Sequence, residues 1–284
     1  MTIERLAVVG AGFMGSGIAE SAAAAGVAVT LYEPDQGPLE RSRERLRASV
    51  ARAVEGGKRT EAEGEALIGR ITYSSSLEDL TEADAAIEAV FEDVAVKGDI
   101  FKQLDTLLPD AQFLASNTSS IPIAELAAFT TRPERVVGLH FFSPVPVMKL
   151  VEVVAALDSS DQAVQAAEAF ATQIAKQPIR TKDRAGFVVN MLLVPYLMAG
   201  VRMFEEGFAT REDIDTGMKL GCGHPMGPLT LCDFIGLDVL EAVCDSLYEE
   251  FKRSEYAAPP LLKRMVVSGH LGRKSGRGFY EYER

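Results

Sequence analysis

The fold is decided by the stretch Leu6-Ala7-Val8-Val9-Gly10-Ala11-Gly12-Phe13-Met14-Gly15. A short apolar run of β-strand character leads into three glycines spaced Gly-x-Gly-x-x-Gly, and the alanine-rich segment Ile18–Ala25 follows as a predicted helix. Glycines at these positions let the backbone approach a ligand closely, and a helix N-terminus offers unpaired N–H groups to an anion. The stretch therefore predicts a strand, a phosphate-binding turn and the opening of a helix, with a plain glycine turn as the alternative.

The next predicted strand, Val27–Tyr32, ends at Glu33. In strand–turn–helix folds of this kind, a carboxylate at this place accepts hydrogen bonds from the adenosine ribose of a dinucleotide. Glu33 would repel a phosphate on that ribose, so the pattern predicts NAD and favours it over NADP. The alternative interpretation is a solvated loop carboxylate beside Asp35.

Strand and helix signals alternate through the first part of the chain. Further strands are predicted at Ile71–Tyr73, Ala85–Ala89, Phe113–Ser116, Val136–Leu139 and Leu150–Val154, and further helices at Pro38–Val54, Val94–Leu108 and Ile123–Phe129. Helices of this length between strands are typical of βαβ units, which build a parallel sheet with helices on both faces. The predicted fold class is α/β, with a Rossmann-like doubly wound sheet.

The pattern changes beyond Asp183-Arg184-Ala185-Gly186, where periodic apolar residues predict helices at Phe187–Phe204, Arg211–Leu220, Gly236–Phe251 and Leu261–Ser268. We therefore expect two domains, an NAD-binding Rossmann-like domain over residues 1–184 and an all-α domain over residues 185–284. The most apolar run, Phe187–Val201, is shorter than the roughly 20 residues of a membrane span and is predicted as a buried helix.

The chain has 284 residues and a formal net charge of -12, from 29 basic and 41 acidic side chains. This balance disfavours non-specific binding to nucleic acid or to an anionic membrane. Cys222, Cys232 and Cys244 form no Cys-x-x-Cys pair, so neither a disulfide framework nor a thiolate zinc site is predicted, and no metal is expected. Reduced thiols and an N-terminus without a signal-peptide pattern indicate a cytoplasmic protein.

Oxidation of a secondary alcohol by hydride transfer requires a base for the hydroxyl proton, and histidine suits this task because its unperturbed pKa lies near neutrality. Of the three histidines, His140 follows the apolar run Val136–Leu139. It is therefore expected at the carboxyl end of a strand, the edge at which open α/β sheets bind ligands. His224 and His270 fall in loops, and a structural or solvated role is predicted for them.

Three polar residues are candidates to act with His140. Glu152 lies in the apolar strand Leu150–Val154, where a charge is costly unless paired, so it is the candidate to orient the imidazole; the alternative is a sheet-edge carboxylate in solvent. Ser119 is a candidate donor to the substrate oxygen, or an ordinary helix N-cap. Asn190, an amide within an apolar helix, either satisfies itself inside that helix or faces the active site.

Together these segments resemble the 3-hydroxyacyl-CoA dehydrogenase family, specifically its short bacterial 3-hydroxybutyryl-CoA branch. The resemblance covers nearly the whole chain and rests on Gly10–Ala19, Ser116–Ile121, His140–Leu150, Gly186–Asn190, Met218–Gly221, Pro225–Pro228 and Gly272–Tyr280. Many dehydrogenases share the glycine turn. The block that begins at His140, with its fixed distance to Glu152 and Asn190, is far more specific.

The resemblance implies an NAD-dependent oxidoreductase that interconverts (S)-3-hydroxyacyl-CoA and 3-ketoacyl-CoA, with short-chain substrates such as 3-hydroxybutyryl-CoA and acetoacetyl-CoA. Such an activity belongs to fatty acid metabolism and β-oxidation. The resemblance makes His140 the catalytic base and Glu152 its orienting carboxylate. It makes Ser119 and Asn190 the contacts to the reacting oxygen.

The resemblance also implies which residues bind the cofactor. They are Gly10, Ala11, Gly12, Phe13, Met14, Gly15 and Glu33 for the adenosine and pyrophosphate part, and Glu92, Lys97, Asn117, Ser119, Ser143 and Lys274 besides. Two positions depart from the family, because Ser143 stands where asparagine is usual and Met191 stands where arginine is common. Both departures bear on affinity or on acyl-chain length rather than on a catalytic role.

The coenzyme A end is expected at the basic stretch from Arg41 to Arg59, whose seven basic and two acidic residues give a local charge of +5. The family binds coenzyme A in this region, and the resemblance makes Ser49 and Lys58 the candidate contacts. The alternative is a solvated helix face with ion pairs between residues four apart.

By the same resemblance, two subunits form a homodimer through the C-terminal helical domain. Two alternatives to the enzymatic assignment stay open. The chain is either an NADP-dependent or non-CoA 3-hydroxy acid dehydrogenase, or a non-catalytic NAD-binding protein that keeps the scaffold alone. The presence of all four proposed site residues argues against the second.

Overall fold

The structure is a computed structural model that describes residues 2–283. The chain divides between Arg184 and Ala185 into two compact units. Each unit contains a hydrophobic core cluster built from its own residues. Each unit therefore buries its own set of apolar side chains.

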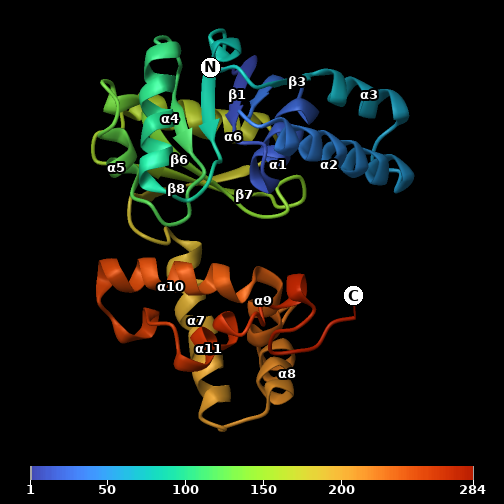
Figure 1. The fold of residues 1–284 in the computed structure, drawn as a ribbon, viewed down its shortest axis with the longest axis vertical. Coiled ribbons are helices and arrows are strands. Elements are labelled where there is room, and N and C mark those ends of the chain that lie inside the picture. The colour runs from blue at the N-terminus through green and yellow to red at the C-terminus, as the bar shows by residue number, and fades with distance from the viewer. Residues whose placement is uncertain (1, 284) are drawn as a thin grey trace. The chain divides into compact units, whose positions relative to one another are not determined.

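The described part of the first unit contains one eight-stranded sheet in the order β3-β2-β1-β4-β5-β6-β7-β8 (Figure 1). The strands are β1 (Arg5–Val9), β2 (Ala28–Tyr32), β3 (Ile71–Ser74), β4 (Ala85–Glu88), β5 (Leu114–Ser116), β6 (Val136–Phe141), β7 (Leu150–Ala155) and β8 (Gln177–Lys182). From β1 to β6 all neighbours are parallel. The strand order reverses between β1 and β4, and sheets of this kind bind ligands at the carboxyl ends of the strands at such a reversal.

Helices cover both faces of this sheet. They are α1 (Phe13–Ala24), α2 (Gln36–Glu55), α3 (Glu61–Gly69), α4 (Val94–Leu107), α5 (Ile123–Ala127) and α6 (Asp161–Gln173), with 3-10 turns η1 (Leu77–Leu80) and η2 (Pro133–Arg135). Residues of α1, α2 and α6 share one core cluster with the strands. Right-handed crossovers place α4 and α5, which follow the reversal, on the opposite face. The predicted Rossmann-like doubly wound fold is confirmed.

The prediction of a wholly parallel sheet is wrong at one edge. Strand β7 runs antiparallel to β6, and β8 pairs parallel to β7 at the edge of the sheet. No apolar run marks Gln177–Lys182 as a strand, and it contains Pro178, which an edge strand tolerates because one row of its backbone groups has no partner strand. The antiparallel pairing matters for the site, because it sets His140 directly opposite Glu152.

Helix α1 begins at Phe13 rather than at Ile18. Three helices were not predicted: α3, α6 and, in the second unit, α9 (Pro228–Ile235). The early start of α1 is possible because Gly15 packs against the turn that precedes the helix: a Cβ there would lie 1.8 Å from the carbonyl oxygen of Gly10. Helix α3 does carry a sequence signal, the capping box formed by Thr60 and Glu63.

The second unit is helical in its described part. It comprises α7 (Val189–Glu205), α8 (Arg211–Cys222), α9 (Pro228–Ile235), α10 (Leu237–Phe251) and α11 (Pro260–Val267), with 3-10 turns η3 (Ser254–Tyr256) and η4 (Arg273–Ser275). Within residues 2–283, no helix combines the length and apolar character that crossing a membrane requires.

Two buried carboxylates bind the backbone in or next to two of the segments on which the family resemblance rests. Asp215 on α8 accepts hydrogen bonds from the backbone N–H groups of Leu229 (2.8 Å) and Thr230 (2.9 Å) at the start of α9. Asp233 on α9 accepts from the N–H groups of Phe279 (2.8 Å) and Tyr280 (2.9 Å). The segment Gly272–Tyr280 therefore serves the packing of this unit. Within Pro225–Pro228, Gly227 packs closely on Asp215, because a Cβ at Gly227 would lie 2.3 Å from the Asp215 side chain.

Candidate active site

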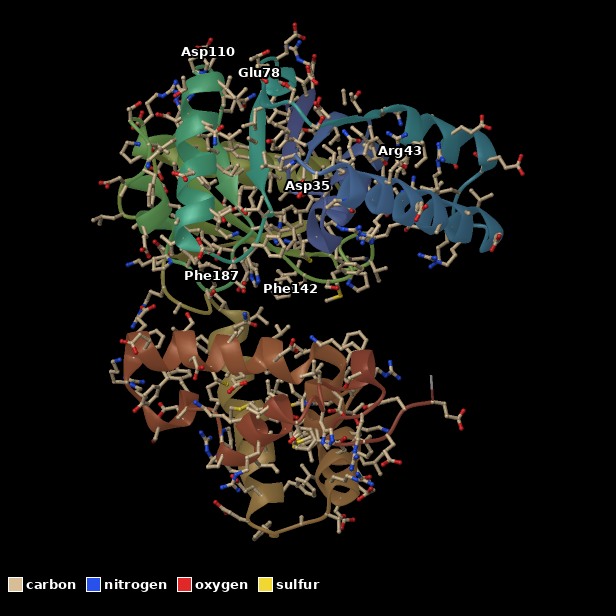
Figure 2. The ribbon with its side chains drawn as sticks, in the orientation of Figure 1. Asp35, Arg43, Glu78, Asp110, Phe142 and Phe187 are labelled. Carbon is tan, nitrogen blue, oxygen red and sulfur yellow. The ribbon has the colours of Figure 1, made fainter. Side chains whose placement is uncertain are left out.

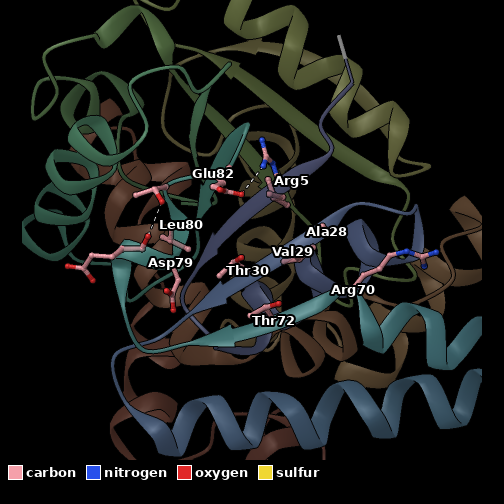
Figure 3. A pocket seen from close by; sticks show the side chains of 13 residues that line it. Arg5, Ala28, Val29, Thr30, Arg70, Thr72, Asp79, Leu80 and Glu82 are labelled. Carbon is pink, nitrogen blue, oxygen red and sulfur yellow. Dashed lines mark hydrogen bonds and ion pairs between the residues drawn. The ribbon is translucent and has the colours of Figure 1, made fainter.

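The predicted cofactor and catalytic residues of the first unit lie at or after the carboxyl ends of the strands, whereas the predicted coenzyme A contacts lie on and after α2. Figure 2 shows Phe142, which follows β6, at one end of the sheet and Asp110, which precedes β5, at the other. A cavity of about 340 Å³ lies at the amino ends of β1, β2 and β3, where Arg5, Ala28 and Thr72 line it (Figure 3). None of the predicted site residues lines that cavity.

The glycine turn joins β1 to α1, and one side of it packs tightly against the neighbouring backbone. Gly10 has a φ of +105°, and a Cβ there would lie 2.6 Å from the carbonyl oxygen of Ala89. Gly12 is the N-cap of α1 with open space where a Cβ would stand, and no described side chain caps the N–H groups of the first turn. The turn therefore offers exposed amides to an anion, which fits the pyrophosphate of a dinucleotide.

The other residues of the turn surround this opening. Ala11 is buried, Met14 is half-buried and Phe13 is exposed. Glu33 lies beside the turn, because its Oε2 accepts a hydrogen bond from the backbone N–H of Ala11 at 3.1 Å. A half-buried carboxylate next to exposed amides fits the ribose and pyrophosphate of NAD.

His140 and Glu152 form a buried pair across β6 and β7. His140 Nδ1 lies 2.7 Å from Glu152 Oε2, and the two residues are 7% and 0% exposed. An ionised carboxylate can only accept, so it fixes the hydrogen on Nδ1 and makes Nε2 the basic nitrogen of the ring. The ring of Phe142 packs against the imidazole with 4.7 Å between centroids. The arrangement is that of an oriented acid/base.

Ser119 lies in a turn after β5 that Glu92 holds. Glu92 Oε1 accepts hydrogen bonds from the Ser119 N–H (3.0 Å), the Thr118 hydroxyl (2.5 Å) and the Ser120 hydroxyl (2.8 Å). Burial alone would raise the pKa of the Glu92 carboxyl, but the Lys97 ammonium and these hydrogen bonds outweigh burial and lower it. Ser119 is not the N-cap of the following helix, since Pro122 occupies that position.

Lys97 and Asn117 are engaged with the protein itself. Lys97 is 1% exposed and pairs with Glu88 (2.6 Å) and Glu92 (3.2 Å). Asn117 Oδ1 accepts a hydrogen bond from the Phe141 N–H at 2.9 Å, which ties the end of β5 to the end of β6 beside His140. Both residues therefore hold the edge of the sheet in place.

The remaining predicted residues lie farther along the chain. Ser143 is exposed in the loop between β6 and β7. Asn190 is half-buried near the start of α7, and Lys274 forms an ion pair with Asp238 (2.6 Å). Asn190 and Lys274 belong to the second unit, so the structure brings together only the site residues of the first.

The predicted coenzyme A contacts neighbour residues of a recess but do not line it. Ser49 on α2 donates a hydrogen bond from Oγ to Glu20 Oε1 at 2.9 Å, while Lys58 is exposed in the turn after α2. Beside Glu20 lies a recess of about 270 Å³, lined among others by Arg59, Lys149 and Lys176. Burial raises the pKa of the Glu20 carboxyl, against the opposing effects of the Ser49 hydrogen bond and of Arg59, Arg52 and Lys176.

Two polar residues near the site had not been predicted. Glu88, at the end of β4, is fully buried, and its Oε2 accepts a hydrogen bond from the Ser116 hydroxyl at 2.6 Å. Lys176 donates hydrogen bonds from Nζ to the carbonyl oxygens of Val145 (2.5 Å) and Met148 (2.9 Å), and so holds the loop that follows the His140 strand. For Glu88 the signal was available: a charge at the end of the apolar run Ala85–Ile87 requires a partner.

No group of three or more His, Cys, Asp or Glu side chains in the described range 2–283 is arranged to hold a metal ion.

Each of the two units matches the model of a known protein family. The model of the 3-hydroxyacyl-CoA dehydrogenase NAD binding domain matches residues 5–184, and that of the 3-hydroxyacyl-CoA dehydrogenase C-terminal domain matches residues 186–282. A curated 3-hydroxybutyryl-CoA dehydrogenase of Mycobacterium tuberculosis is 54% identical over 283 residues, which cover 99% of each chain.

Solved structures of two similar proteins match this chain over nearly its full length. A crystal structure of M. tuberculosis FadB2 is 53% identical with a TM-score of 0.98 and covers 100% of both chains. The crystal structure of an (S)-3-hydroxybutyryl-CoA dehydrogenase from Ralstonia eutropha is 43% identical with a TM-score of 0.95, covering 99% of this chain and 100% of the other.

Proposed function

Because the chain belongs to the 3-hydroxyacyl-CoA dehydrogenase family, we propose that it is an NAD-dependent dehydrogenase that interconverts (S)-3-hydroxybutyryl-CoA and acetoacetyl-CoA. The observation that carries the proposal is the buried His140–Glu152 pair, which lies at the same edge of the sheet as the glycine turn. The names of full-length relatives support the short acyl chain.

The proposed mechanism gives each predicted catalytic residue a role. The amides of the glycine turn would hold the pyrophosphate of NAD and Glu33 its adenosine ribose, and the bound cofactor would supply the hydride chemistry at C3. His140 takes the proton of the 3-hydroxyl group on Nε2, and Glu152 stabilises the resulting imidazolium. Ser119 and Asn190 hold the oxygen as it gains carbonyl character. In the reverse direction the His140 imidazolium returns the proton.

The experiment that tests the proposal is a spectrophotometric assay with acetoacetyl-CoA, run with NADH and with NADPH, and repeated with free acetoacetate. We expect oxidation of NADH with the thioester, and much slower reaction with NADPH because Glu33 repels the added phosphate. Absence of turnover with both cofactors would favour a cofactor-binding protein. Preference for NADPH would contradict the expectation that Glu33 excludes the phosphate on the ribose. Preference for free acetoacetate would contradict the assignment of a coenzyme A thioester as substrate.

We further propose that the phosphates of coenzyme A lie at the cationic recess beside Glu20. The recess brings Arg59 and Lys149 together on a chain whose net charge is -12. The two predicted contacts neighbour residues that line this recess. Ser49 donates a hydrogen bond to Glu20, and Lys58 directly precedes Arg59 in the sequence. A dense anion on an acidic protein needs such a local cluster of cations.

Replacing Arg59 or Lys149 with alanine should raise KM for acetoacetyl-CoA by about tenfold, or about 1.4 kcal/mol, the order of one hydrogen bond between charged groups. The KM for NADH should not change. Steady-state kinetics with acetoacetyl-pantetheine provides the control, since this thioester lacks the 3′-phospho-ADP group. An equal loss with both thioesters would show that the recess does not hold the phosphates.

We also propose that the second unit mediates a homodimer, that the first unit is the cofactor-binding domain and that the protein is cytoplasmic. Apolar side chains are exposed on the second unit, among them Leu192 (72%) and Leu220 (81%), and such side chains are frequent at subunit interfaces. The free thiols of the three cysteines agree with a reducing compartment.

If this assignment is correct, light scattering should give twice the mass of one chain, and the double change Leu192→Asp and Leu220→Asp should lower it to one. Leu157→Asp is the matched control, because Leu157 is exposed to 91% on the first unit. A single-chain mass for the unaltered protein would contradict the dimer.

A further inference from the structure

Lys176, directly before β8, carries an ammonium group that is buried within the first unit. The residue is 9% exposed, and its Nζ donates hydrogen bonds to the carbonyl oxygens of Val145 at 2.5 Å and Met148 at 2.9 Å. Burial lowers the pKa of this ammonium, and the attraction of the Glu20 carboxylate opposes that effect. Burying a charge is costly unless hydrogen bonds compensate for the lost water. The ammonium is therefore stabilised by the backbone that it holds.

The backbone of Lys176 is itself fixed to two elements of the first unit. Its N–H donates a hydrogen bond to the carbonyl oxygen of Ala171, in the last turn of α6, at 2.9 Å. The N–H of Gln177, the next residue, donates to the carbonyl oxygen of Lys149 at 2.7 Å. The lysine side chain therefore extends from a well-anchored position.

The two carbonyl oxygens that Lys176 holds belong to the loop at residues 142–149, which joins β6 to β7. Val145 and Met148 lie on either side of the middle of this loop. Its first residue, Phe142, packs against the His140 imidazole with 4.7 Å between ring centroids. A shift of the loop would therefore move Phe142 relative to the imidazole.

Helix α1 contacts the same loop at Val145. This residue is 1% exposed, and a Cβ at Gly17 of α1 would lie 2.9 Å from the Val145 Cβ. Carbon atoms of two side chains do not approach each other so closely, so the packing depends on the glycine. Val147, by contrast, is 69% exposed. The Lys176 ammonium and the contact with α1 therefore determine where the loop lies.

We propose that Lys176 is a positioning residue, which holds the loop 142–149 so that Phe142 keeps the His140 imidazole in place. The proposal rests on the proposed function, in which His140 exchanges a proton with the reacting oxygen. Lys176 also lines the recess that we assign to the phosphates of coenzyme A. A direct contact between Lys176 and the substrate is therefore the alternative role that the test has to separate.

The test measures Lys176→Met with acetoacetyl-CoA and with acetoacetyl-pantetheine, which lacks the 3′-phospho-ADP group. Methionine is similar to lysine in length but cannot donate hydrogen bonds to the two carbonyl oxygens. We expect kcat to fall roughly 10- to 100-fold with both thioesters, the scale on which misplacing a reacting group is costly. The dissociation constant for NADH should stay close to its original value. Lys102→Met, which removes an exposed lysine from α4, is the matched control and should change none of these quantities.

Hydrogen exchange shows where the structure loosens. The N–H groups of Val147 and Met148 donate to the carbonyl oxygen of Pro144 within the loop. Exchange of a peptide covering residues 142–150 should therefore accelerate in Lys176→Met, because the loop loses its anchor, while exchange of β1 should not change.

Gly17→Ala displaces the loop without removing the ammonium, and it keeps the proposal testable if Lys176→Met does not fold. The added Cβ has to push Val145 away, while alanine favours the helix. We expect kcat to fall with both thioesters and the dissociation constant for NADH to stay close to its original value. An unchanged kcat in this variant would show that the position of the loop does not matter for catalysis.

The other outcomes for Lys176→Met also contradict the proposal. A higher KM for acetoacetyl-CoA alone, with kcat preserved, would mean that Lys176 contacts coenzyme A. Unchanged exchange at residues 142–150 would mean that Lys176 does not hold the loop. If the unaltered protein has no activity with acetoacetyl-CoA, the proposed function fails, yet hydrogen exchange still decides whether Lys176 holds the loop.

Discussion

Replacing His140 with alanine should lower kcat by roughly 10²–10⁴, the usual contribution of a positioned general acid/base. The imidazole is the group that would take the hydroxyl proton, and no second histidine lies within the described first unit to replace it. The dissociation constant for NADH should not change, since the glycine turn and Glu33 bind the cofactor. Steady-state kinetics with acetoacetyl-CoA, together with NADH titration, measures both quantities.

Glu152→Gln should lower kcat within the same range, because an amide cannot stabilise the imidazolium and can also donate to Nδ1, which favours the wrong tautomer. His270→Ala is the matched control, since His270 lies in a C-terminal loop of the second unit. Retention of turnover by the His140 variant would remove the basis of the mechanism. Equal losses from the His140 and His270 variants would point to a general loss of folded protein.

Alanine at Gly15 should prevent formation of the cofactor site altogether. A Cβ at that position would lie 1.8 Å from the carbonyl oxygen of Gly10, and backbone on backbone cannot yield as a flexible side chain can. Overpacking of this kind costs about 1–3 kcal/mol or more. We expect a lower unfolding midpoint in urea and no detectable binding of NADH by fluorescence titration.

Gly12→Ala separates the shape of the turn from its contact with the ligand. The position has open space and an ordinary φ of -68°, so the substituted protein should fold with an unchanged urea midpoint. Its added methyl group stands where the pyrophosphate must approach the amides, so NADH affinity should fall by at least about tenfold, or about 1.4 kcal/mol. If NADH binds normally to this variant, the pyrophosphate does not lie over the turn.

The local parts of this site were the most predictable. The spacing Gly10–Gly15 determines a backbone path by sterics within a few residues, and Glu33 follows it at the end of the adjacent strand. His140 was also predictable, because an imidazole directly after an apolar strand has to lie at the end of that strand. In each case the position of the residue is determined by interactions within one turn or one strand.

The parts that depend on pairing between distant segments were harder to predict. The direct opposition of His140 and Glu152 follows from the antiparallel register of β6 and β7, whereas the sequence pattern had predicted a parallel neighbour. Lys97 is buried because it pairs with Glu88 of β4. A short sequence motif around Lys97 does not contain this contact with another segment. The polar strand β8 forms at an edge, where burial selects few apolar residues.

For Asn190 the sequence left two alternatives open, and the role of Lys274 was indicated by the resemblance alone. An amide within an apolar helix, or a lysine in a glycine-rich turn, has several satisfactory environments inside its own unit. Lys274 illustrates this, because it already forms an ion pair with Asp238.

In the proposed mechanism the His140 imidazole, held by Glu152, supplies and removes the proton at the reacting oxygen. A stopped-flow single turnover tests this role: enzyme saturated with NADH meets excess acetoacetyl-CoA, and the decay of nicotinamide absorbance is followed. With His140→Gln the decay should be slower by roughly 10²-fold or more, although every active site is filled. Decay at the original rate would show that the proton at the reacting oxygen comes from another group.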